Sequence, residues 1–259
     1  MKVTILGSGP SSGVPMVGGI WGDCDPNEPK NHRRRASILV EKGDTTILVD
    51  TSPDCRAQLL DANVSRADAV VYTHAHADHS HGIDDLRWLN LAMHADISIY
   101  GDRQTIDSLR ERFWYAFEPL KFFENHPVRY YKPMLAPHVI ESPFAIGGIE
   151  ITPFSQDHGF SRSLGFRFGK FAYSTDVVAL DDVAFDVLQG VDTWVVDSFR
   201  REPHQTHSHL ARTLEWIERL HPRRAVLTHM NHHMDYATLV NELPGGVEPA
   251  YDGMVLDIT

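Results

Sequence analysis

Three histidines and one aspartate occur within six consecutive positions, in the order His-Ala-His-Ala-Asp-His from His74 to His79. The motif directly follows the apolar run 69–72, which is typical of a buried strand. Neutral imidazole and carboxylate groups bind divalent zinc or manganese. The spacing therefore predicts a strand that delivers metal ligands at its carboxyl end.

Isolated ligand-type residues follow three further apolar runs. These residues are Asp157 with His158, Asp176 and His229, after the runs 151–154, 171–173 and 224–227. One such residue at a strand end is usually structural, but four strand ends that all present them favour a shared site. In open α/β sheets the carboxyl ends of the strands line the functional crevice, so we expect these side chains to converge there.

The elements that position these residues are short β-branched runs and helix-period segments. The expected strands are residues 3–6, 37–40, 46–49, 69–72, 97–100, 149–152, 164–168, 171–173, 193–196, 225–227 and 254–258. The expected helices are residues 57–60, 84–93, 105–117, 180–188, 207–220 and 236–243. The early strands follow one another as hairpins and the later ones alternate with helices, which predicts mixed sheets with helices packed outside.

The stretch 118–148 contains five prolines and is interpreted as an irregular insertion at one edge. An aromatic cluster, residues 113–117 with Phe122 and Phe123, runs into it. Core filling beneath a long loop is the favoured interpretation, and a subunit contact or a pocket wall is the alternative.

Composition bounds the class of protein. Hydrophobic residues make up 42% and charged residues 23% of the 259 residues, which is typical of a globular protein. No stretch of the sequence has the composition of a linker, so we expect one domain over residues 1–259. No apolar run has the length of a membrane span or of the core of a signal peptide. The two cysteines, Cys24 and Cys55, are too few for a disulfide framework. A cytoplasmic protein is therefore expected. The formal charge of −11 opposes binding of long nucleic acids, although a local cationic pocket could still bind phosphate.

The motif, followed in order by a later His, a later Asp and a last His, resembles the signature of the metallo-β-lactamase superfamily, from about Val3 to the C-terminus. The resemblance implies a four-layer αβ/βα sandwich with two metal ions at one edge. It implies that His74, His76 and His158 bind one ion, that Asp78, His79 and His229 bind the other, and that Asp176 bridges them.

Two divalent ions, zinc or manganese, about 3.5–4 Å apart can share a hydroxide formed at neutral pH, and that hydroxide would be the nucleophile. Asp78, as an implied ligand of one of these two ions, is therefore a predicted catalytic residue. Asp50 matches an early aspartate of the family that holds a ligand imidazole in its correct tautomer. Its alternative role is a simple cap at the end of the strand 46–49.

Smaller features narrow the reaction. A carboxylate rather than a cysteine at position 176 resembles the phosphodiesterase and thioester branches, which argues against lactam hydrolysis. The segments 7–15, 33–37, 229–232 and 251–254 resemble those of phosphoribosyl cyclic phosphate phosphodiesterases and the related tRNA 3′-processing ribonucleases. Ser11 in the glycine-rich turn and Arg35 in the basic run 33–35 are candidate substrate contacts, although such features are as often structural.

His207 matches an additional active-site histidine of that branch, at the expected start of a helix. We expect its protonated form to contact substrate and to donate to a phosphate oxygen or to the leaving alkoxide, with His209 as the competing candidate.

The chain departs from the family at a cysteine-rich structural zinc site, where Asp23, Asp25, Glu28 and His232 occupy the corresponding region. A loop held by ordinary hydrogen bonds is favoured there over an oxygen-rich metal site.

The leading hypothesis is a dinuclear metal hydrolase that cleaves a small phosphodiester, a cyclic ribose phosphate or a nucleotide-like compound. No membrane association is expected, and a homodimer is one possibility. The alternatives are tRNA 3′-end processing, hydrolysis of an ester, thioester or lactone, and a metal-dependent module that senses a nucleotide. The acidic chain carries no glycine-rich basic arm of the kind that would hold tRNA.

Overall fold

The computed structural model describes residues 1–119 and 131–259, and its strands form two sheets of seven strands within those residues. The first sheet has the order β14 (Val255–Asp257), β1 (Lys2–Gly7), β2 (Ser37–Lys42), β3 (Thr45–Val49), β4 (Ala69–Val71), β5 (Ile97–Gly101), β6 (Leu135–Val139). The second has the order β13 (Val247–Pro249), β12 (Arg224–Thr228), β11 (Thr193–Asp197), β10 (Phe171–Ser174), β9 (Ser161–Phe168), β8 (Ile149–His158), β7 (Phe144–Ile146).

Both sheets are mixed in the same way. In the first, β14, β1, β2 and β3 are antiparallel, and β3 to β6 are parallel. In the second, β7 to β10 are antiparallel, and β10 to β13 are parallel. The mixed pairing and the outer helices confirm the predicted αβ/βα sandwich.

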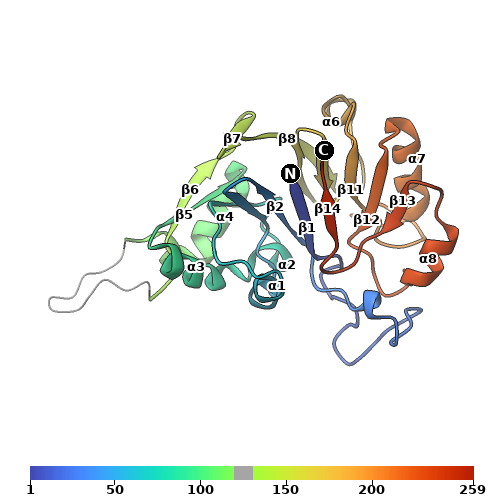
Figure 1. Ribbon diagram of the computed structural model, residues 1–259, viewed down its shortest axis with the longest axis horizontal. Helices are drawn as coiled ribbons and strands as arrows, with labels where there is room; N and C mark the ends of the chain where they lie inside the picture. Colours follow the sequence, from blue (N-terminus) through green and yellow to red (C-terminus); the bar gives the residue numbers. More distant parts are fainter. Residues whose placement is uncertain (120–130) are drawn as a thin grey trace.

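Helices cover the outer faces of the two sheets, as Figure 1 shows. They are α1 (Cys55–Asp61), α2 (Ala77–Ser80), α3 (Leu86–Met93), α4 (Arg103–Arg112), α5 (Trp114–Phe117), α6 (Asp182–Leu188), α7 (Leu210–Leu220) and α8 (Tyr236–Glu242), with short 3-10 turns at Pro29–Asn31 and Ile83–Asp85. Residues of α1 and α3–α5 pack against the first sheet, and residues of α6–α8 pack against the second. None of the helices in the described part of the chain has the length and apolar character that a membrane span requires.

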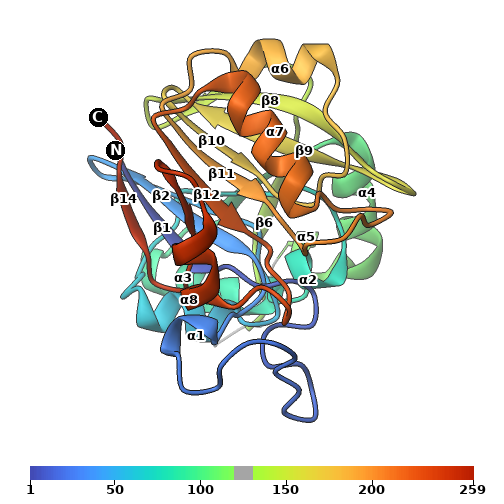
Figure 2. The ribbon, with the colours of Figure 1, turned by 90° about the vertical axis from the view of Figure 1, so that its right-hand side faces the viewer.

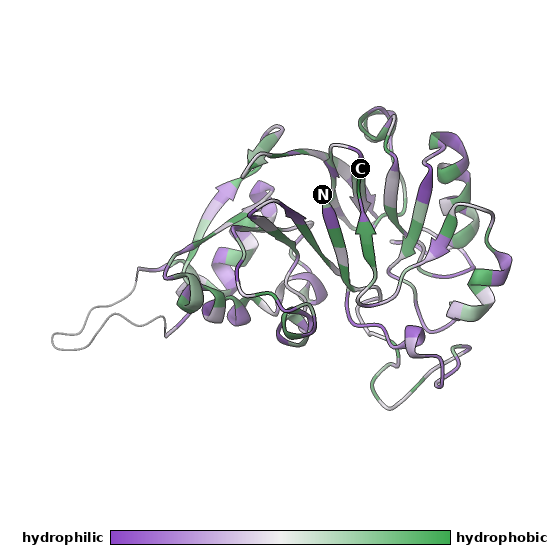
Figure 3. Cartoon of the chain, in the orientation of Figure 1, coloured by the Kyte–Doolittle hydropathy of each residue, from purple (hydrophilic) through white to green (hydrophobic). Residues whose placement is uncertain are grey.

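The central strands β3 and β4 of the first sheet are apolar on both faces because both faces are covered. Along β3, Ile47 and Val49 face the second sheet, whereas Leu48 faces the helices. The same alternation places Val70 of β4 among the helices and Val71 between the sheets, as the two-residue period of a strand requires. Figure 3 shows hydrophobic residues along these strands and hydrophilic residues on the outer sides of the helices.

Several predicted boundaries were wrong. Stretch 118–148 is not wholly irregular, because β6 and β7 lie within it; β6 contains Pro137, which an edge strand tolerates. The helix predicted over 105–117 breaks at Phe113, and β8 continues beyond residue 152 to His158. The helix predicted from residue 207 begins at Leu210, so His207 lies in the loop before α7. Phe122 and Phe123 lie outside the described residues.

Candidate metal centre

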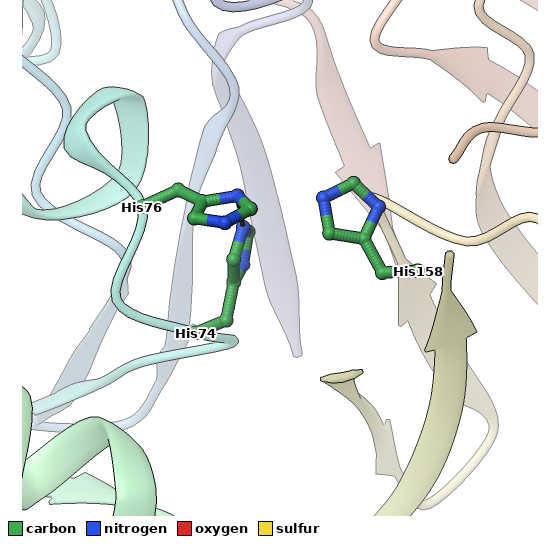
Figure 4. A group of neighbouring side chains, drawn as sticks. All are labelled: His74, His76 and His158. Atoms are coloured by element: carbon green, nitrogen blue, oxygen red, sulfur yellow. Dashed lines mark hydrogen bonds between the residues drawn. The ribbon is translucent and has the colours of Figure 1, made fainter. Parts of the chain in front are cut away.

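The ends of four strands bring ligand-type side chains to one place. The loop after β4 and the short helix α2 carry the first motif, β8 ends at His158, and Asp176 and His229 follow β10 and β12. Four overlapping groups could hold a metal ion there, and within each the ligand atoms lie within 4.8 Å of one another. Two consist of the predicted metal ligands: His74 with His76 and His158, and Asp78 with His79, Asp176 and His229. The other two include His207: His158 with Asp176 and His207, and Asp197 with His207 and His229. In Figure 4 the rings of His74 and His76 face that of His158 across the gap between the two sheets.

Asp176 lies between the two groups, and each of its oxygen atoms faces one of them. Oδ1 lies 3.9 Å from Nε2 of His74 and 3.5 Å from Nε2 of His158. Oδ2 lies 3.0 Å from Nε2 of His79 and 3.4 Å from Nε2 of His229. One carboxylate is therefore positioned to contribute an oxygen atom to each of two cation sites.

Hydrogen bonds fix which nitrogen atom of three histidines faces the cluster. Nδ1 of His79 donates to Oδ2 of Asp50 at 2.7 Å, and Nδ1 of His158 donates to the carbonyl of Thr206 at 2.7 Å. The hydroxyl of Thr73 donates to Asp50, so it accepts from Nδ1 of His74 at 3.0 Å. Each Nδ1 carries the proton, which leaves the lone pair on Nε2 free for a cation.

The cluster is buried and highly charged. Burial alone would lower the pKa of His229, but Asp176 and Asp78 outweigh it and raise the pKa to about 9. Burial alone would raise the pKa of Asp176, but His229 and His79 outweigh it and hold that pKa well below its usual range. At His74, burial and the neighbouring His79 outweigh Asp176 and hold the pKa well below its usual range.

The donor set fits divalent metal ions. Nε2 of His79 and both ring nitrogens of His229 are buried without a hydrogen bond in the described structure. Nε2 of His74 lies 2.9 Å from Nδ1 of His76, so two ring nitrogens face each other where a cation would separate them. Imidazole and carboxylate are suitable ligands for zinc or manganese, and metal binding would replace the protons that these groups share.

Three residues of the site have strained backbones. Asp50, Asp176 and His229, each just beyond the end of a strand, have φ values of 64°, 54° and 59°. Aspartate and histidine adopt this left-handed conformation more readily than most residues, but each instance still costs on the order of 1–3 kcal/mol. Such strain gathers at functional sites, where the surrounding structure holds the side chain in a required direction.

His207 joins the cluster from the loop before α7. Its ring stacks on His229 with 4.7 Å between centroids and on Phe199 with 4.8 Å. Nδ1 lies 2.9 Å from Oδ2 of Asp197, a fully buried carboxylate at the end of β11. His209, the competing candidate, is the residue that precedes the first turn of α7 and belongs to none of the groups that could hold a metal ion in the described residues.

Asp197 and Thr73 were not predicted from the sequence to be functional residues. Asp197 follows the run 193–196 in the same way that the recognised ligands follow their strands, so the signal was present. Thr73 directly precedes the motif, but only the structure shows that its hydroxyl links Asp50 to His74.

Other candidate residues lie outside the cluster. Ser11 is exposed and Arg35 pairs with Asp54 at 3.2 Å, so their contact with substrate stays a prediction. Arg33 is only 2% exposed and donates to the carbonyls of Asn231 and Met234, which makes it a structural residue rather than a phosphate contact.

The residues at the position of the family's structural zinc site do not gather into a group that could hold a metal ion, within the described part of the chain. Asp23 pairs with His233 at 2.8 Å, whereas His232 packs on Gly22. Asp25 accepts from the backbone of Asn27, and Glu28 accepts from that of Lys30. Hydrogen bonds thus link these residues to their neighbours in the described structure, and the absence of a metal site here stays a prediction.

Comparison with known proteins places the chain in a family. The family model described as the beta-lactamase superfamily domain matches residues 45–230. The crystal structure of a new diphosphatase from the PhnP family superposes with a TM-score of 0.88 at 32% identity, over 98% of this chain and 96% of that one. Human tRNase Z, short form, has a TM-score of 0.70 at 18% identity over 100% of both chains, which shows the shared fold alone.

Two curated relatives match the sequence. An octanoyltransferase of Porphyromonas gingivalis is 29% identical over 98% of this chain and 51% of its own length. A ribonuclease Z of Bradyrhizobium is 39% identical over 30% of this chain and 28% of its own length. The chain thus spans about half or less of these relatives. Together with the family model and the PhnP-family structure, these matches show that the chain belongs to the metallo-β-lactamase superfamily, in its PhnP-like branch.

Proposed function

We propose that the protein is a dinuclear metal hydrolase that cleaves a small phosphodiester, a cyclic ribose phosphate or a nucleotide-like compound. The observation that carries the proposal is the position of Asp176, whose two oxygen atoms face two separate sets of imidazoles at 3.0–3.9 Å. A single cation site would not need a carboxylate whose two oxygen atoms face two different sets of imidazoles.

In this proposal His74, His76 and His158 would hold one zinc or manganese ion, and Asp78, His79 and His229 would hold the other. Asp176 would contribute to both sites. Divalent ions bound there would supply Lewis acidity, which stabilises negative charge on a phosphoryl oxygen and lowers the pKa of a water molecule. Asp50, Thr73 and the carbonyl of Thr206 keep three of the ligand imidazoles in the tautomer that binds metal.

His207 is the proposed proton donor. Its Nδ1 faces Asp197 at 2.9 Å, which leaves Nε2 to hold a proton and to release it to the leaving oxygen atom. The Asp197 carboxylate holds the ring through Nδ1, and the rings of Phe199 and His229 both stack against it. The leaving oxygen then departs as an alcohol rather than as an alkoxide.

A small phosphodiester is favoured by two observations. The relative with 32% identity is described as a diphosphatase from the PhnP family, which is an activity on phosphate compounds rather than on a lactam. The net charge of −11 opposes binding of a long polyanion. Processing of tRNA 3′ ends is the second candidate, because the local match of 39% identity is to a ribonuclease Z.

We do not assign the octanoyltransferase activity of the first relative to this protein, since the chain matches only 51% of that relative's length. We also propose a cytoplasmic location, which suits Cys24 and Cys55, both buried and unpaired.

The test is a substrate panel with the zinc- or manganese-loaded protein: bis(p-nitrophenyl) phosphate, a 2′,3′-cyclic nucleotide, a pre-tRNA and a lactone. We expect turnover of the first two. His207→Ala should lower that turnover by about 100-fold, as removal of a general acid does, with unchanged metal content. His209→Ala is the matched control and should keep full activity. Cleavage of only the pre-tRNA or only the lactone would overturn the choice of substrate.

A further inference from the structure

Four segments that lie far apart in the sequence meet at one side chain, the carboxylate of Asp252. They are the segments that resemble the family's phosphodiesterases, residues 7–15, 33–37, 229–232 and 251–254. Figure 2 shows β14 beside β1, and because this pair is antiparallel, the end of β1 and the chain that enters β14 lie at the same end of the sheet. Among the residues of these segments, the proposed reaction requires only His229.

The Asp252 carboxylate joins the turn after β1 to the segment before β2. Its Oδ1 accepts from both the backbone N–H and the hydroxyl of Ser8, each at 2.9 Å. Its Oδ2 accepts from the backbone N–H of Arg34 at 2.8 Å. Hydrogen bonds to a charged acceptor are stronger than those between neutral groups. Each oxygen atom of Asp252 therefore holds one of the two segments.

The glycine-rich turn that carries Ser8 packs directly on the basic segment. A Cβ atom at Gly7 would lie 2.0 Å from the carbonyl oxygen of Arg35, so a larger residue would not fit there. The backbone N–H of Gly9 donates to the carbonyl of Arg34 at 2.8 Å. The glycines thus permit a close approach of two backbones, which gives this turn a structural role.

Ser8 in turn contacts the segment that carries the ligand His229. Its carbonyl accepts from the backbone N–H of Met230 at 3.1 Å, and both residues are fully buried. This N–H belongs to the planar peptide unit between His229 and Met230. The hydrogen bond therefore fixes the rotation of that unit against His229, whose backbone has the strained φ of 59°.

His229 depends on its backbone more than the other buried ligand histidines do. Nδ1 of His74, of His79 and of His158 each donates to a protein oxygen atom. Nδ1 of His229 has no such hydrogen bond among the described residues. A partner at this nitrogen normally orients the ring of a metal-binding histidine. The orientation of His229 thus rests on its backbone and on stacking with His207.

We propose that Asp252 is a positioning residue for the metal ligand His229, through Ser8 and Met230. The carboxylate fixes Ser8, the Ser8 carbonyl fixes the peptide unit after His229, and that unit directs the imidazole toward the second cation site. The inference rests on the proposed function, since it takes His229 as a ligand of a bound ion. It gives the four segments a shared role, which is to set the affinity for that ion.

Hydrogen exchange tests this link without reference to catalysis. In Asp252→Asn the amide leaves either Ser8 or Arg34 without an acceptor, whichever way it is oriented. We expect the N–H of Met230 to exchange about tenfold faster than in the wild type, with and without bound zinc. The N–H of Val226, in the middle of β12, should be unchanged. Burial raises the pKa of Asp252 to about 6, so exchange is followed at pH 8, where the wild-type carboxylate is ionised.

Asp61→Asn is the matched control, because the Asp61 carboxylate pairs with the side chain of Arg34 rather than with a backbone N–H, and exchange at Met230 should not change. Ser8→Ala removes one of the two donors to Oδ1 of Asp252 and should give a smaller increase at Met230. Unchanged exchange at Met230 in Asp252→Asn, or in Ser8→Ala if only that variant folds, would overturn the inference. An increase of equal size at Val226 would overturn it as well, because the effect would then be a general loss of stability.

Zinc affinity, measured by competition with a chelator, tests the effect on the ligand. We expect Asp252→Asn to weaken binding of one ion by about tenfold and to leave the other unchanged, as loss of a group that orients a ligand does. Crystals of this variant grown with limiting zinc should show the lower occupancy beside His79 and His229. Two unchanged zinc affinities would contradict the positioning role, even if Met230 exchanges faster. Binding of two ions without turnover of any phosphodiester would contradict the proposed function and leave this inference standing.

Discussion

Oδ2 of Asp197 lies 2.9 Å from Nδ1 of His207, and the same oxygen atom accepts from the backbone N–H of Val177 at 3.1 Å. The second contact links the end of β11 to the segment that follows Asp176. The carboxylate therefore holds His207 in a fixed relation to the residue that lies between the two proposed metal sites.

Asp197→Asn tests this relationship. The amide keeps the size of the side chain but replaces the anionic acceptor that orients the His207 ring through Nδ1, so we expect kcat to fall by about 10–100-fold. Metal content, measured by elemental analysis of the same preparation, should not change. Asp192→Asn makes the same change at a partly exposed aspartate that pairs with Arg223 and should keep the wild-type kcat. An equal loss of metal and activity in Asp197→Asn would mean that Asp197 supports the ligands instead.

Asp176→Asn tests the bridging role. Asparagine tolerates the positive φ of 54° as well as aspartate does, so the backbone should not be disturbed. The amide leaves one good acceptor in place of two anionic oxygen atoms. We expect the metal content to fall from two ions to one or none per chain, and turnover to fall with it. Full occupancy by two ions in this variant, measured after dialysis, would remove Asp176 from its proposed position.

Arg33→Met tests whether Arg33 is a structural residue. The buried guanidinium satisfies the carbonyls of Asn231 and Met234 and the side chain of Asn31. Since loss of a buried charged donor leaves these acceptors unpaired, we expect the free energy of unfolding to fall by about 3–5 kcal/mol in urea titrations.

Arg34→Met is the matched control, because Arg34 forms a more exposed ion pair with Asp61 that contributes less than about 1 kcal/mol. A stable Arg33→Met protein with a raised KM would contradict the structural role and indicate that Arg33 contacts substrate.

Asp235 should make stability depend on pH in acid. Burial alone would raise its pKa, but hydrogen bonds from Thr238 and Asn31 outweigh it and lower the pKa to about 2 from the ordinary 3.8. The folded state thus favours the ionised carboxylate, so its contribution is complete above about pH 4 and is lost as the pH falls toward 2.

Asp235→Ala should cost about 1 kcal/mol at pH 7, the usual value for a helix cap, and the difference from the wild type should shrink between pH 4 and pH 2. Urea unfolding of the metal-free protein at several pH values measures it, with Asp44→Ala in an exposed turn as the control. A difference that stays constant down to pH 2 would contradict the assignment.

The strands that present the cluster could be predicted because their apolar residues form continuous runs with polar residues at the ends. The runs before His74 and His229 are β4 and β12, and both are buried among other strands. The strand β13 could not be predicted in this way, since it has three residues and contains Pro249. Its pairing with β12 depends on the rest of the sheet.

Contacts between distant residues account for the other differences. Arg33 lies in a basic run that suggests a solvated or phosphate-binding surface, but its partners Asn231 and Met234 are 198 and 201 positions away. No local pattern indicates that such a residue will be buried. Ser8 and Asp252 likewise lie 244 positions apart, and only the fold joins them.

The most direct test of the account is anomalous diffraction from crystals of the zinc-loaded protein, collected on both sides of the zinc absorption edge. The account predicts two peaks about 3.5–4 Å apart, one beside His74 and His158 and one beside His79 and His229, with Asp176 between them. A single peak, or none among these residues, would contradict the claim that the chain binds a pair of metal ions.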